Sequence, residues 1–172
     1  MKSCIVDKIS KVPLTVRENW AKSLIFNLRF LHEIGVVHGN INLQNIHVDS
    51  RNKITIVDNR SPDLKRTDSL LYKSPEFFFG SKNESKDSDV WAAGICVYYI
   101  IAVKFPWQRA SISDRHYMEW VKEGKLSSRN EGCFEVAIKI MLGVSSRPPL
   151  NSITKKFLKP KLNSKIICKF LQ

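Results

Sequence analysis

The segment HGNINLQN, residues His38 to Asn45, separates a helical pattern from a pattern typical of a β-hairpin. Before it, Thr15 and Glu18 have the spacing of a capping box, which predicts that a helix begins at Thr15. Gly35 predicts the end of this helix, because glycine favours the left-handed conformation of helix C-termini. The helix has an apolar stripe formed by Ala21, Leu24, Ile25, Leu28 and Leu31.

After the segment, two short β-branched runs, Ile46–Val48 and Ile54–Val57, flank five polar residues and predict a small hairpin. Farther on, an apolar run predicts a buried central helix over Asp89–Val103, which we expect the Phe105-Pro106-Trp107 turn to terminate. The run is shorter than the roughly 20 residues that span a bilayer. The remaining patterns predict a polar loop over Asn59–Leu70 and helices over Arg115–Glu123, Phe134–Leu142 and Asn151–Leu158.

The composition agrees with one globular domain that is soluble and basic. The chain has 172 residues, and its net charge is 28 − 16 = +12, which favours acidic partners. Six lysines and no acidic residue follow Thr154. We expect a solvated tail there, or else a contact for an acidic partner or a nuclear-entry signal; no motif favours nucleic acid. The four separated cysteines indicate reduced thiols, hence a cytoplasmic or nuclear protein without a zinc knuckle.

At this point the sequence resembles the protein kinase superfamily. His38 to Asn45 is similar to the catalytic loop, H-R-D-L-x-x-x-N. Four further motifs follow in the family's order: Val57-Asp58-Asn59-Arg60 for D-F-G, Ser74-Pro75-Glu76 for A-P-E, Asp89-Val90-Trp91-Ala92-Ala93-Gly94 for the start of the central helix, and Arg147-Pro148. The Phe105-Pro106-Trp107 run, with Tyr117 and Trp120 downstream, further resembles the SH3-binding-kinase branch and the fungal transporter-regulating branch of Ser/Thr kinases.

The resemblance covers only the family's C-terminal lobe. Fourteen residues precede Thr15, and the sequence has no Gly-rich loop and no strand lysine before His38. We therefore expect a mainly α fold: a helical bundle around a buried central helix with one small hairpin, the N-terminal lobe being absent. Residues 1–158 are predicted to form this lobe and residues 159–172 a basic tail.

The resemblance implies a degenerate catalytic site. Asn40 stands where the family has the aspartate that accepts the substrate proton, and an amide cannot take that proton. Asn42 replaces the family's lysine and Gly39 its arginine. His38 is implied to be structural, so no member of the loop His38, Asn40, Asn42 and Asn45 is expected to be an intact catalytic residue.

Four other positions have implied roles. Asn45 and Asp58 match the family's Mg²⁺-facing residues; they form a vestigial ATP/Mg²⁺ site, or else only brace the loop. Glu76 and Arg147 are implied to form a structural ion pair. Asp89 and Trp91 are implied to be structural residues of the central helix, and no other metal site is expected.

Three functions remain open. The first is a catalytically inactive, pseudokinase-like domain that acts by binding a protein with an acidic surface, with a protein kinase as the implied partner. The second is a truncated Ser/Thr kinase with residual nucleotide binding. The third is a fragment of a larger active kinase. No membrane association is expected.

Overall fold

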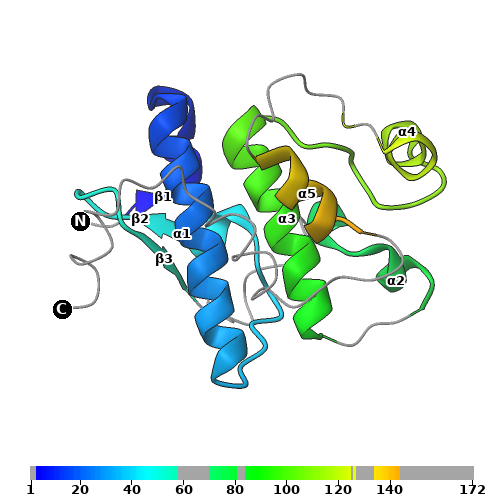
Figure 1. Ribbon diagram of the computed structural model, residues 1–172, viewed down its shortest axis with the longest axis horizontal. Helices are drawn as coiled ribbons and strands as arrows, with labels where there is room; N and C mark the ends of the chain where they lie inside the picture. The colour runs from blue at the N-terminus through cyan, green and yellow to red at the C-terminus, as the bar shows by residue number, and fades with distance from the viewer. Residues whose placement is uncertain (1–2, 58–69, 81–83, 125, 127–133, 144–172) are drawn as a thin grey trace.

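Two long helices form the centre of the molecule (Figure 1). The computed structural model describes residues 3–57, 70–80, 84–124, 126 and 134–143. Helix α1 (Leu14–Glu33) packs against α3 (Lys86–Ala102), and a small sheet lies on the side of α1 away from α3. The shorter helices lie toward the other end of the molecule: α2 (Pro75–Phe78), α4 (Arg115–Glu123) and α5 (Glu135–Met141). The predicted mainly helical fold is confirmed.

The sheet contains the predicted hairpin and one further strand. Strands β2 (Ile46–Val48) and β3 (Ile54–Ile56) pair antiparallel, with Ile46 opposite Ile56. Strand β1 (Ser3–Cys4) adds to the outer side of β2, so the order is β1-β2-β3. Two residues are too few for an alternating pattern, which is why the sequence did not predict β1. Short 3₁₀ helices complete this region: η1 (Ile5–Asp7), η2 (Ile9–Lys11) and η3 (Leu43–Asn45).

The predicted capping box at Thr15 is wrong. Helix α1 begins at Leu14, and Pro13 occupies the N-cap position with φ −65° and ψ 159°. The amides of Val16 and Arg17 already donate to the Pro13 carbonyl oxygen, at 3.1 and 3.3 Å. Thr15 therefore lies inside the first turn, where its side chain cannot act as the cap. The predicted stop at Gly35 is confirmed by its φ of 82° directly after the C-cap residue Ile34.

Helix α3 begins earlier than predicted and does not depend on proline for its end. Ser85 and Ser88 form a reciprocal capping box, so the helix begins at Lys86 rather than Asp89. It ends at Ala102, because Val103 adopts a left-handed conformation with φ 56° and its amide donates to Tyr99 O at 2.7 Å. Pro106 follows this stop but does not cause it.

The core is continuous from the sheet to α5. Leu24, Leu28 and most of α3 are fully buried. Gly94 permits the closest approach, since a Cβ at this position would lie 2.9 Å from Leu142 Cδ2. The run after α3 joins this core through Trp107, which packs against Trp91 and Tyr117 with ring centroids 5.8 and 5.2 Å apart.

Asp114 fixes the connection between this aromatic cluster and α4. One carboxylate oxygen accepts from the backbone amides of Gln108 and Arg109, and the other accepts from those of His116 and Tyr117 in the first turn of α4. Burial opposes the charge on Asp114, but the four amides outweigh burial and hold its pKa below the usual range.

Within the described residues, no helix is long and apolar enough to cross a membrane. Most of the predicted loop over Asn59–Leu70, the predicted helix over Asn151–Leu158 and the basic tail lie outside the described residues.

Candidate functional site

Three asparagines of the 38–45 segment form a local hydrogen-bond network. The side-chain amide of Asn42 donates to both the carbonyl oxygen and the Oδ1 of Asn40, at 3.1 and 3.0 Å. Asn42 Oδ1 accepts from the backbone amide of Asn45 at 3.0 Å, and Asn45 Nδ2 donates to the Asn40 carbonyl oxygen at 2.9 Å. The loop is therefore held by neutral groups, without an ion pair among these three side chains.

His38 connects this loop to the end of the hairpin. Its side chain is buried, and its Nδ1 accepts the Asn40 backbone amide at 3.2 Å. Its Nε2 lies 3.3 Å from the carbonyl oxygen of Val57. Both contacts are satisfied only by the neutral ring with the proton on Nε2. The His38 ring therefore has a structural role, because it links the loop to the end of the hairpin.

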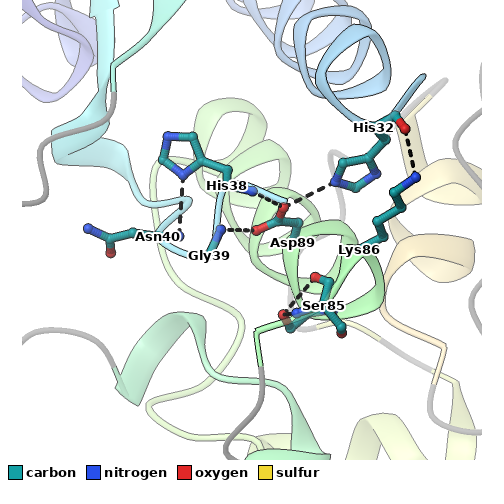
Figure 2. Close-up of polar contacts among 8 residues, drawn as sticks. His32, His38, Gly39, Asn40, Ser85, Lys86 and Asp89 are labelled. Atoms are coloured by element: carbon teal, nitrogen blue, oxygen red, sulfur yellow. Dashed lines mark hydrogen bonds and ion pairs between the residues drawn. The ribbon is translucent and has the colours of Figure 1, made fainter. Parts of the chain in front are cut away.

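Asp89, in the first turn of α3, holds the start of the loop (Figure 2). Its Oδ2 accepts the His38 amide at 2.8 Å and its Oδ1 accepts the Gly39 amide at 2.8 Å. His32 Nε2, from α1, lies 3.1 Å from Asp89 Oδ2, and Lys86 Nζ donates to the His32 carbonyl oxygen at 2.7 Å. Asp89 is 1% exposed, so this carboxylate joins α1, α3 and the loop at one buried point.

Gly39 occupies a position that other residues would strain. Its φ is 72°, and a Cβ on Gly39 would collide with the side-chain carboxylate of Glu84. Only glycine takes this conformation without a steric penalty. The resemblance places the family's arginine here, and the positive φ opposes any side chain at this position in this chain.

The structure places some of the sequence-predicted residues and leaves others undescribed. Asn40 is half-buried and its carboxamide points away from Asp89, whereas Asn45 and Trp91 are buried. Glu76 lies half-buried in α2. Asp58 and Arg147 lie outside the described residues, so neither the Mg²⁺-facing pair nor the Glu76–Arg147 ion pair is tested.

Sequence reasoning missed two residues of this region. His32 continues the buried row Leu24–Leu28 by one helical turn, and a polar side chain on an apolar stripe is the signal that could have found it. Tyr72 lies with its hydroxyl 3.5 Å from the Leu43 amide, across 29 residues of sequence. No local pattern indicates such a contact.

Of the two residues that the resemblance places near a nucleotide-bound Mg²⁺, only Asn45 is among the described residues. Asn45 uses its Nδ2 within the loop, so its Oδ1 is the atom that would face Mg²⁺. Mg²⁺ requires an octahedron of oxygen ligands and usually a carboxylate, which Asp58 would have to supply. Within the described ranges, no group of three or more His, Cys, Asp or Glu side chains is placed to hold a metal ion.

These features together define a kinase-like lobe: a braced loop between a long helix and a hairpin, anchored by the first turn of a buried helix. Comparison with known proteins gives the same class. Residues 2–166 match the family profile described as protein kinase domain. The chain belongs to the protein kinase family.

Individual relatives match a large part of this chain but a small part of their own length. The serine/threonine-protein kinase chk-1 of Caenorhabditis elegans is 29% identical over 119 residues, which is 63% of this chain and 24% of the relative. The dual serine/threonine and tyrosine protein kinase of Gallus gallus is 30% identical over 159 residues, or 84% of this chain and 17% of the relative. The chain therefore spans about a quarter or less of these relatives.

Proposed function

We propose that this chain is a catalytically inactive, pseudokinase-like lobe that acts by binding another protein. The observation that carries the proposal is Asn40, which stands where the family has its proton-accepting aspartate. A carboxamide has no basic site at neutral pH, and the Asn40 Oδ1 already accepts from Asn42. Loss of a positioned general base typically lowers a rate by about 10²- to 10⁴-fold.

A phosphoryl-transfer assay tests the inactivity. The full chain is incubated with labelled ATP, Mg²⁺ and a general protein substrate, alongside Asn40→Asp and Asn45→Ala. We expect no transfer above background from the unchanged chain or from Asn45→Ala, because Asn40 supplies no proton-accepting group at the family's catalytic position. Transfer by the unchanged chain that Asn45→Ala abolishes would contradict the proposal.

The partner we propose is a protein with an acidic surface, and a protein kinase is the first class to test. The net charge of +12 supports an acidic partner. Affinity capture with the tagged chain and with Asn40→Asp tests binding without catalysis, since binding should be equal for the two. Recovery of no protein above a tag-only control would remove the support for a binding role.

The second candidate function is a truncated Ser/Thr kinase, or a piece of a longer one, with residual ATP and Mg²⁺ binding. The observation in its favour is Asn45, whose side chain is buried and oriented by the Asn40 carbonyl oxygen. A thermal shift with ATP and Mg²⁺ that Asp58→Ala abolishes, and Asp63→Ala does not, would favour this candidate. The absence of any shift at millimolar nucleotide would count against it.

A further inference from the structure

We draw no further inference here: the strongest candidate, the exposed apolar row of Phe26, Phe30 and Ile34 on the outer face of α1, is an unpartnered surface, and nothing in the structure shows what covers it.

Discussion

Replacing Asp89 with alanine should remove the anchor of the 38–45 segment. The carboxylate accepts the His38 and Gly39 amides, both at 2.8 Å, and the residue is 1% exposed. The alanine variant leaves both amides without their acceptor in a place that water reaches poorly. It also removes the acceptor beside His32 Nε2, at 3.1 Å.

The magnitude follows from the number of donors left unpaired. A buried donor without a partner costs about 1–3 kcal/mol, so two amides give a loss of about 2–6 kcal/mol. A domain of this kind has a total stability of about 5–15 kcal/mol. Asp89→Asn keeps one acceptor oxygen but turns an N–H group toward a second donor, so we expect about half of the alanine effect.

Urea unfolding followed by circular dichroism measures the loss, and hydrogen exchange locates it. The midpoint for Asp89→Ala should fall by about 1–3 M, given an m-value of about 2 kcal/mol/M, and the His38 and Gly39 amides should lose protection. Asp87→Ala is the control, because Asp87 is exposed in the same helical turn and contributes only about 0.3–1 kcal/mol through the helix dipole. Equal losses for Asp89→Ala and Asp87→Ala, or unchanged exchange at residues 38 and 39, would refute the reasoning.

Three further changes test other contacts of the fold by thermal unfolding. Asp114→Ala should cost about 1–2 kcal/mol at neutral pH, as the loss of a helix cap does. Because the folded-state pKa is lowered, this contribution should begin to fall as pH drops below the ordinary aspartate pKa and be lost as pH passes below the folded-state pKa, so a cost that stays constant into strong acid would be the contrary result. Arg17→Met should cost about 1–3 kcal/mol, because its Nη1 donates to the carbonyl oxygen of Ile101 at the end of α3 at 2.7 Å; no loss would mean that solvent replaces this contact. Gly39→Ala should cost about 1–2 kcal/mol because of its positive φ. Adding Glu84→Ala removes any clash with the Glu84 carboxylate but should leave this backbone cost. Full recovery of stability in the double variant would show that the φ is not strained.

Most of the architecture was predictable because it depends on local patterns. Three local patterns each predicted one kind of element: the apolar stripe of α1, the two β-branched runs of the hairpin, and the apolar run of α3. The elements formed where these patterns occur. Helix boundaries were predicted less well. Proline at position 13 displaced the cap expected at Thr15, and the Ser85–Ser88 box started α3 before its apolar run. A boundary depends on a few backbone groups, which several neighbouring residues can satisfy.

Side-chain chemistry in the 38–45 segment was readable from the residues alone. An asparagine cannot act as a base wherever it lies, so the expected loss of catalysis at Asn40 rests on its identity and on the family position. The order of the motifs along the chain likewise indicated the kinase family, which the comparison confirmed.

Long-range partnerships needed the tertiary structure. Asp89 meets His38 and His32 across 51 and 57 residues, and Glu84 fills the space beside Gly39 across 45 residues. The sequence by itself determined the class of fold and the identity of each group in the loop, because periodicity and residue chemistry are local properties. Only the packing of α1 against α3 decided which groups meet Asp89, because one helix has several faces and burial selects among them.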